Sequence, residues 1–353
     1  MLLLIFLFLF SSAFCFKVGF IYIGPIEDCG WSYAHELGRQ YIETMITDLE
    51  TEYYENIPGG EKSTEKLREL AENGCDLIFA TSYDYMDSVL EVAAEYPDVI
   101  FMHCSGYKRS ENVGTYFGRI YQADFLAGLV AGKMSKTNLV GYVAPVKIPE
   151  VMRGVDSFAI GVMKANNDAK VLIEWIGDWT DKEKEIKATE NLIEQEVDVI
   201  AHGMDTATVN MTADEHGVWS IGYNHDMSKY AFVTHLTAPV WYWGELYLNI
   251  VENVIHKTWK SEDLWPGIET GEVELAPLNG IVTSDIRRLI EKYRIDMILN
   301  RFHVFEGPLN NQSGEIEIEK GIIPDDQYLL TIDWLVENIV DKADISERIP
   351  HIH

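Results

Sequence analysis

Short apolar runs alternate with helix-length amphipathic segments through the first two thirds of the chain, and this alternation limits the fold more than any other feature. A strand buried on both faces of a sheet forms a continuous apolar run, whereas a helix that covers the sheet shows one apolar face. The pattern therefore predicts an α/β fold with parallel sheets. Strands are expected at residues 18–23, 77–80, 99–103, 139–143, 171–176, 197–201 and 218–222.

The segments between these runs are expected to be helices. They fall at residues 33–47, 61–73, 86–95, 122–134, 150–165, 182–195 and 206–216. An acidic run over residues 43–55 is interpreted as a solvated helix face. After residue 233 the regular alternation of strands and helices ends. A Trp-rich helix is expected over 240–254, another near 285–299 and a last one around Trp334. Such a tail can return the chain between two lobes, for which 353 residues are sufficient.

The beginning of the chain has the pattern of a secretory signal peptide. The first ten residues are almost all Leu, Ile and Phe, and the small residues Ser11, Ser12 and Ala13 follow them. This run is too short to cross a bilayer core, which needs about 20 apolar residues, and no other segment approaches that length. We therefore expect a signal peptide over residues 1–16, a secreted or periplasmic mature protein and no direct membrane insertion.

The formal net charge of −29 limits the partners of the mature chain. A surface this acidic repels phosphate backbones and anionic lipids, so nucleic acids and membrane surfaces are poor partners. The cysteines after the expected leader are Cys29, Cys75 and Cys104. They are odd in number and lack the spacing of a zinc site, so neither a disulfide framework nor a bound metal is expected.

The loops that follow the expected strands carry the candidate site residues, because small ligands bind beyond the carboxyl ends of the strands in open α/β sheets. The first such loop holds Asp28 and Trp31. A carboxylate can bind the edge of a planar ligand, and an indole can cover its face. An ordinary strand-to-helix turn, with Asp28 as the helix cap and Trp31 in the core, remains the alternative.

Catalytic motifs are absent from the sequence. It contains no GxSxG elbow, HExxH pair, P-loop or GxGxxG turn. His202 with Asp205, or His225 with Asp226, could form an acid–base or metal pair, but polar side chains at a cleft rim explain these residues with fewer assumptions. The preferred interpretation is a protein that is not an enzyme and needs no cofactor.

Several segments of the chain together match one family pattern in their order and spacing. They are residues 18–25 with 28–31, 79–87, 112–116 with 125–128, 149–154, 205–206, 221–223 with Asp226, and 306–308. Together they resemble the basic membrane protein family of substrate-binding proteins, which includes the purine nucleoside receptors of bacterial ABC importers. The resemblance extends from Lys17 to about Trp334.

The resemblance implies a type I periplasmic-binding-protein fold, in which two Rossmann-like lobes with parallel sheets are joined by three crossovers and close on a ligand. The implied N-lobe comprises residues 17–120 and 238–285, and the implied C-lobe comprises residues 121–237 and 286–353. A small-molecule purine is the implied ligand, and a membrane transporter is the implied partner.

The family also implies roles for individual residues. In such proteins an Asp and an aromatic residue of the first loop bind the purine, which places Asp28 and Trp31 there. Trp179 is the best match for a second aromatic residue in the other lobe. Asp205 and Asp226, with Asn224 as a substitute, match positions that reach the base edge or the sugar hydroxyls.

One departure from the family pattern bears on the ligand. Nucleoside-binding members carry a Lys after the Thr of the second crossover, whereas here Thr237 leads to Trp241. An indole would fill the space of the sugar, so a free purine base such as adenine is expected in preference to a nucleoside. The full set of expected ligand-binding residues is Asp28, Trp31, Ser82, Tyr83, Trp179, Asp205, Asn224, Asp226 and Trp241.

A nucleoside-cleaving hydrolase that uses the cleft carboxylates is the competing hypothesis. Clustered Asp side chains could bind a metal ion and activate water. The candidate carboxylates here come one from each loop, whereas nucleoside hydrolases need a tight cluster. The binding protein is therefore the preferred class.

Overall fold

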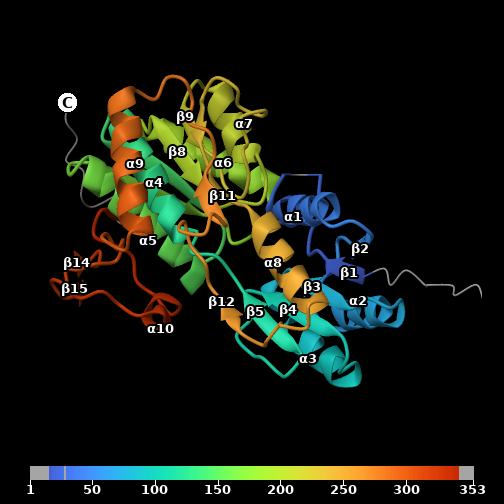
Figure 1. Cartoon of the computed structure of the whole chain (residues 1–353). Coiled ribbons are helices and arrows are strands. Elements are labelled where there is room, and N and C mark those ends of the chain that lie inside the picture. Colours follow the sequence, from blue (N-terminus) through green and yellow to red (C-terminus); the bar gives the residue numbers. More distant parts are fainter. Residues whose placement is uncertain (1–15, 28, 342–353) are drawn as a thin grey trace, which may run out of the picture.

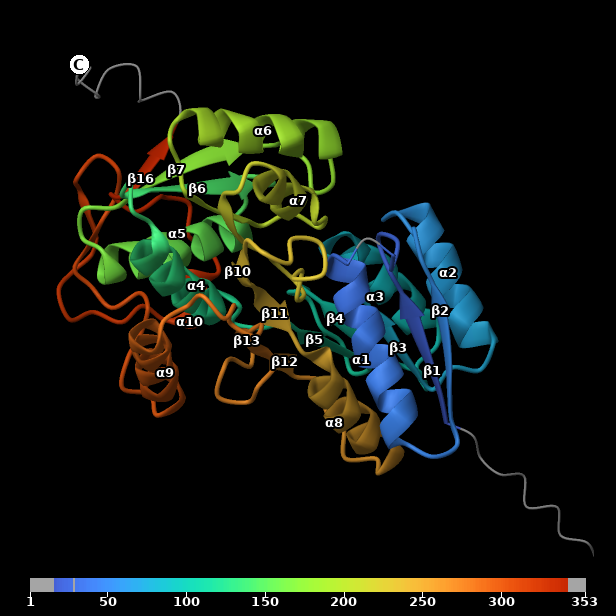
Figure 2. The ribbon, with the colours of Figure 1, turned by 90° about the horizontal axis from the view of Figure 1, so that it is seen from above.

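The computed structural model describes residues 16–27 and 29–341 of the 353-residue chain. Asp28 and the expected leader, apart from Phe16, lie outside the described residues. The described chain forms two lobes side by side, one coloured blue to cyan and the other green to yellow in Figures 1 and 2. Each lobe is built on a parallel six-stranded sheet, which confirms the predicted fold class.

The first sheet has the strand order β12-β5-β4-β3-β1-β2 and is parallel throughout. Its central strands are almost completely buried, because continuous apolar runs suit strands with helices on both faces. The strands are β1 (Phe16–Ile21), β2 (Leu49–Tyr54), β3 (Leu77–Ala80), β4 (Ile100–Cys104), β5 (Val113–Tyr116) and β12 (Asp263–Leu264).

The second sheet has the order β10-β9-β8-β6-β7-β16 and is also parallel throughout. Its last strand comes from the end of the described chain and pairs with β7 at the sheet edge. The strands are β6 (Leu139–Ala144), β7 (Lys170–Trp175), β8 (Val199–His202), β9 (Trp219–Ile221), β10 (His235–Thr237) and β16 (Ile339–Asp341).

Helices cover both sheets. The helices are α1 (Trp31–Met45), α2 (Glu61–Glu72), η1 (Tyr83–Tyr85), α3 (Met86–Glu95), α4 (Tyr121–Met134), α5 (Pro149–Ala165), α6 (Lys182–Glu194), α7 (Thr208–Glu215), α8 (Trp243–Ile255), α9 (Ser284–Ile298) and α10 (Asp326–Leu329). Helices α1 and α8 lie side by side in the first lobe (Figure 2). Helices α4 and α5 approach so closely that a Cβ atom at Gly128 would overlap the carbonyl oxygen of Phe158.

Three stretches of the described chain cross between the lobes. Residues 117–120 lead from β5 to α4, residues 238–242 lead from β10 to α8, and residues 265–283 lead from β12 to α9. The second stretch contains β11 (Pro239–Trp241) and the third contains β13 (Val273–Leu275), which pair antiparallel. These two crossovers therefore form one ribbon between the lobes (Figure 2).

Residues 305–341 form a C-terminal extension that packs on the second lobe, coloured red in Figure 2. It contains β14 (Leu309–Asn310), β15 (Ile316–Ile318), α10 and β16. Buried polar contacts hold it on α5, because the carboxylate of Asp156 accepts the Val336 amide at 2.8 Å and the amide of Asn338 donates to the Ala159 carbonyl at 2.8 Å.

Two expectations from the sequence are wrong. The acidic run 43–55 is not a single helix face, because its second half is the edge strand β2, whose exposed positions accommodate charged side chains. No helix surrounds Trp334, which lies in a loop and donates its indole N–H to the Tyr328 hydroxyl at 3.2 Å. Among the described helices, none is both long and apolar enough to span a bilayer.

Candidate functional site

The two lobes touch through the loops that follow β1 and β8. A Cβ atom at Gly30 would overlap the carbonyl oxygen of Asp205, so these two backbone segments are in direct contact. Beside them, the Sγ atom of Cys29 lies 2.9 Å from the Tyr230 hydroxyl. The carboxyl ends of the two sheets therefore meet at this point, where the family resemblance implies a ligand site.

Trp31 begins α1 directly after this contact. Its indole N–H donates to the carbonyl oxygen of Thr81 at 2.6 Å. The half-buried ring packs at right angles against Trp241 and Trp243, with centroid distances of 5.6 and 6.0 Å. Trp31 thus packs on the aromatic core, as expected for an ordinary strand-to-helix turn. It also borders the lobe contact, as expected for a residue of a ligand site.

Three candidate residues form one hydrogen-bonded chain. The side-chain amide of Asn224 donates to the carboxylate of Asp205 at 2.8 Å and accepts the indole N–H of Trp241 at 3.0 Å. Asn224 is fully buried and has a φ of 67°, a left-handed conformation that asparagine tolerates better than most residues. Because the ring of Trp241 contacts Trp31, the structure brings these four residues together.

Trp241 is fixed on several sides. It is 2% exposed, stacks on Trp243 with a centroid distance of 4.8 Å, and packs on Phe117 at 5.2 Å. A Cβ atom at Gly118 would lie 2.6 Å from its ring, so the first crossover passes directly over the indole. A lysine at this position would bury an ammonium group among aromatic rings at a large cost in free energy.

Trp179 lines a cavity of about 20 Å³ on the C-lobe side. Its carbonyl oxygen accepts the backbone amide of Asp205 at 3.1 Å. The carboxyl groups of Asp124 and Glu150 also line the cavity; burial raises the pKa of both, and the charge of Arg153 opposes that shift. Such a volume holds about one water molecule, so a purine enters here only if the surrounding loops or side chains move.

The remaining candidates make their contacts elsewhere. Ser82 is buried next to the start of η1. Tyr83 is 59% exposed and stacks on Tyr107 with a centroid distance of 6.0 Å. The carboxylate of Asp226 lies 4.0 Å from Nδ1 of His235. Their expected roles in ligand binding, like that of Asp28, stay predictions.

The buried histidines near the strand ends are held as neutral groups. Burial lowers the pKa of His202 and that of His235 to about 4. Nε2 of His202 lies 2.7 Å from the side-chain oxygen of Asn210, which fixes the ring. Over residues 16–27 and 29–341, no group of three or more His, Cys, Asp and Glu side chains is placed to hold a metal ion.

A buried carboxyl group anchors the loop that carries Asp205. Oε2 of Glu185, on α6, accepts the hydroxyl of Thr206 at 2.6 Å. Glu185 is fully buried, and burial raises its pKa to about 7 although the hydrogen bond from Thr206 lowers it. Its other oxygen has no hydrogen-bond partner among the described residues. A group that titrates near neutral pH therefore contacts the loop at the lobe contact.

Sequence reasoning missed the four titratable residues of the cavity wall, namely Asp124, Tyr142, Glu150 and Tyr223. Two of these residues do not lie in the loops that follow strands. Asp124 lies in the first turn of α4, and Tyr142 lies inside β6. One signal was available, because Asp124 is an acidic residue in an otherwise almost entirely apolar helix. A carboxyl group in such a place is buried, and buried carboxyl groups mark pairing or function.

Comparisons with known proteins give consistent matches. The family model for PnrA-like ABC transporter substrate-binding proteins matches residues 15–304. A purine-binding protein of Brucella abortus is 37% identical over 327 residues, which cover 92% of this chain and 93% of that protein. A putative ABC transporter glucose-binding protein of Haloferax volcanii is 33% identical over 82% of this chain and 74% of that protein.

Solved structures show the same architecture. The crystal structure of a transcriptional activator of the comK gene from Bacillus halodurans matches with a TM-score of 0.72 and 25% identity. The match covers 80% of this chain and 97% of that protein.

Proposed function

Because the chain belongs to the Bmp family of PnrA-like ABC transporter substrate-binding proteins, we propose that it captures a free purine base such as adenine between its lobes. Members of this family are binding proteins, not enzymes, and deliver a small molecule to a membrane transporter. The proposal includes a signal peptide over residues 1–16 and a secreted or periplasmic location. It also includes the lobes defined above, residues 17–120 with 238–285 and residues 121–237 with 286–353.

The hydrogen-bonded chain of Asp205, Asn224 and Trp241 is the observation that carries this proposal. It sets a carboxylate and an amide beside the indoles of Trp31 and Trp241, at the place where the lobes meet. The half-buried indole of Trp31 can stack on a flat base, and amide and carboxylate groups bind the donors and acceptors at its edge. The Brucella relative, which is named for purine binding, supports the same ligand class.

The proposed mechanism is hinge closure. A purine first binds one lobe, and contacts from the other lobe exist only after the lobes meet, so the ligand favours the closed arrangement. Asp28 and Trp31 would hold the base from the first lobe, with Trp179 and Asp205 facing them from the second. Ser82, Tyr83 and Asp226 are proposed to complete the rim.

Adenine is expected to bind at least about tenfold more tightly than adenosine. The indole of Trp241 is bulky, and its N–H is already donated to Asn224, so it offers no hydrogen bond to a ribose hydroxyl. Titration calorimetry with both ligands measures the ratio, and equal affinities would contradict the expectation. Trp241→Phe, which keeps an aromatic ring but is smaller, is expected to narrow the difference.

Glucose belongs in the same titrations, because the Haloferax relative is named for glucose binding. We expect glucose to bind in the proposed purine cleft far more weakly than adenine does. Tighter binding of glucose, lost on changing Asp205 or Asn224, would replace the purine with a sugar as the ligand of the cleft.

Purified protein is expected to bind adenosine and inosine without cleaving them. The lowered pKa values of His202 and His235 leave these rings neutral, and the candidate carboxylates come from separate loops. Chromatography after prolonged incubation, with and without divalent metal ions, detects any free base. Release that scales with protein concentration and disappears in Asp205→Ala would restore the hydrolase hypothesis.

A further inference from the structure

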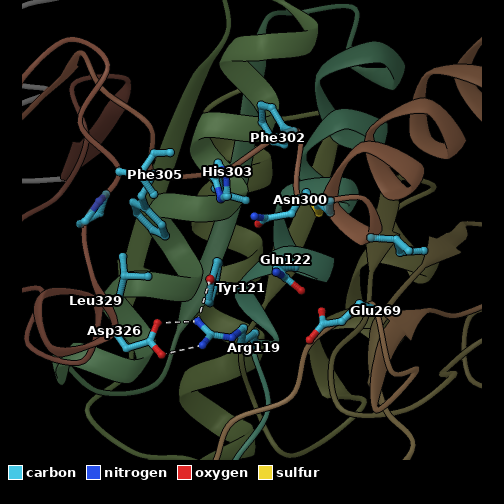
Figure 3. Close-up of a pocket in the computed structure, with 15 residues that line it drawn as sticks. Arg119, Tyr121, Gln122, Glu269, Asn300, Phe302, His303, Phe305, Asp326 and Leu329 are labelled. Carbon is cyan, nitrogen blue, oxygen red and sulfur yellow. Dashed lines mark hydrogen bonds and ion pairs between the residues drawn. The ribbon is translucent and has the colours of Figure 1, made fainter.

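A pocket of about 450 Å³ lies where the crossovers meet the C-terminal extension. Its walls come from Arg119 in the first crossover, Glu269 in the third, residues 297–305 at the end of α9 and beyond, and residues 323–329 around α10 (Figure 3). It shares no lining residue with the cavity beside Trp179. The volume lies in the range of small-molecule sites. We call it the hinge pocket.

Arg119 joins these walls to one another. Its backbone N–H donates to the carbonyl oxygen of Pro266 at 2.8 Å, and its Nε donates to that of Trp265 at 3.0 Å. Its two terminal nitrogens donate to both carboxylate oxygens of Asp326 at 2.8 and 2.7 Å. One side of the hinge pocket is therefore a fixed link between two crossovers and α10.

The charges of the lining exclude an anionic ligand. Arg119 is paired with Asp326, so its charge is already neutralised. Glu269 adds a second carboxylate, and no lysine or further arginine is present among the lining residues. An incoming anion would meet net negative charge in a chain of formal charge −29.

The polar groups of the lining suit hydroxyls. Within the part of the chain that the structure describes, the side chains of Asn300 and His303 make no hydrogen bond. The amide of Gln122 accepts the Ile268 N–H at 2.8 Å through its oxygen, which leaves its NH₂ group as a donor. Figure 3 shows the side chains of Gln122, Asn300 and His303 around one space, with Glu269 at its side.

Amide and imidazole groups form hydrogen bonds with hydroxyls, which both donate and accept. Phe302 and Phe305 add apolar surface to the same pocket, against which the C–H groups of a sugar ring or polyol can pack. An organic amine could donate to Glu269 and to the side-chain oxygen of Asn300, but it would leave the NH₂ donors of Gln122 and Asn300 without partners. A neutral molecule with several hydroxyls satisfies both kinds of group.

We propose that the hinge pocket binds a small neutral polyhydroxylated molecule, a monosaccharide or polyol, and that this occupant favours closed lobes. Hinge segments change their backbone angles when lobes move, and two of the three crossovers line this pocket. In the structure, where the lobes touch, the pocket has a volume of about 450 Å³. An occupant that contacts both crossovers stabilises this arrangement, so it raises the affinity of the cleft for its ligand, and the effect is reciprocal.

The full chain is titrated with ribose, glucose and glycerol, and with putrescine and phosphate as charged comparisons, by calorimetry and ligand-observed NMR. The test variant is Asn300→Gly with His303→Ala, in which glycine keeps the left-handed backbone of residue 300, whose φ is 53°. The matched control is Asn56→Gly, another asparagine with a left-handed φ of 59°, far along the chain from the lining residues. Saturable binding of at least one probe is expected, about tenfold weaker in the double variant and unchanged in the control.

Coupling is measured separately, as the adenine affinity with and without a saturating probe. We expect adenine to bind about fivefold or more tightly with the probe present. The double variant should bind adenine normally when no probe is present, because its residues lie outside the cleft.

Three results would overturn the proposal. They are no saturable binding of any probe, probe binding that the double variant does not weaken, and putrescine or phosphate binding in the hinge pocket in place of the polyols. An unchanged adenine affinity in the presence of a bound probe would overturn the coupling. Because probe binding is measured without adenine, failure of the proposed purine function is distinguishable from failure of the hinge pocket.

Discussion

Alanine at position 30 is expected to weaken purine binding by roughly a hundredfold. The added Cβ atom would overlap the carbonyl oxygen of Asp205, and backbone cannot rotate away as a side chain can. Gly30 has a φ of −101° and a ψ of −145°, so thermal unfolding is measured beside binding to separate a change in the local backbone from loss of the lobe contact. If the closed state becomes rarer, the apparent affinity falls in proportion.

Calorimetric titration with adenine and thermal unfolding of the protein alone test this expectation. Gly24→Ala is the matched control in the same loop, because the nearest atom to its new Cβ would be Oγ of Ser32 at 3.5 Å, an ordinary contact distance. The control should bind like the wild type. Wild-type affinity in Gly30→Ala would mean that these two loops do not meet when the ligand is bound.

Glutamine in place of Glu185 is expected to remove a pH-dependent loss of stability of about 3 kcal/mol. Burial raises the pKa of this carboxyl group from 4.5 to about 7. Between these two values the folded protein holds a proton that the unfolded chain has lost. The contribution to stability is therefore complete below pH 4.5 and is lost as the pH rises through about 7. A carboxamide does not ionise, so the variant escapes this loss.

Urea unfolding from about pH 5 to about pH 8 measures the effect as the difference between variant and wild type. This difference should shift in favour of the variant by about 3 kcal/mol as the pH rises. The stability of the variant can also differ from that of the wild type by an amount that does not depend on pH. This is because the new NH₂ group replaces an oxygen that lacks a partner among the described residues. Glu190→Gln, at an exposed position of the same helix, is the control. A difference that does not change with pH would contradict the raised pKa.

Buried parallel strands could be predicted closely from the sequence. A strand is expected at residues 77–80, and β3 spans Leu77–Ala80; another is expected at 197–201, and β8 spans Val199–His202. Both are buried along their whole length, so nearly every side chain must be apolar and the run is continuous. Because burial favours apolar side chains, these strands are recognisable in the sequence as continuous apolar runs.

Edge strands could not be recognised in the same way. Strand β2 has the sequence LETEYY and pairs only with β1, so its exposed side chains are free to be acidic. Strand β16 has three residues and pairs with β7, which lies far earlier in the chain. Such segments become strands through their partners and not through their own composition.

The candidate site was predictable in part, for a comparable reason. Asp205 and Asn224 follow neighbouring strands, β8 and β9, and the structure joins them by a hydrogen bond. The bond from Asn224 to Trp241 depends on the path of a crossover, which no local pattern reveals. Asp124 lies on a helix behind the loops, so a search along strand ends does not reach it. Closure of Asp28 and Trp179 on a base stays a prediction.

The two sheets are completed at different times as the chain is synthesised. The first sheet receives its last strand at residue 264, whereas the second receives β16 only at residue 341. Until then β7 is an open edge whose unpaired backbone groups can recruit another strand, and long-range pairing of this kind is slow. A chain trimmed after residue 304, where the family match ends, would keep that edge permanently open. The C-terminal extension therefore replaces the six-residue edge of β7 with the three-residue edge of β16, and a short edge strand is less able to recruit another chain.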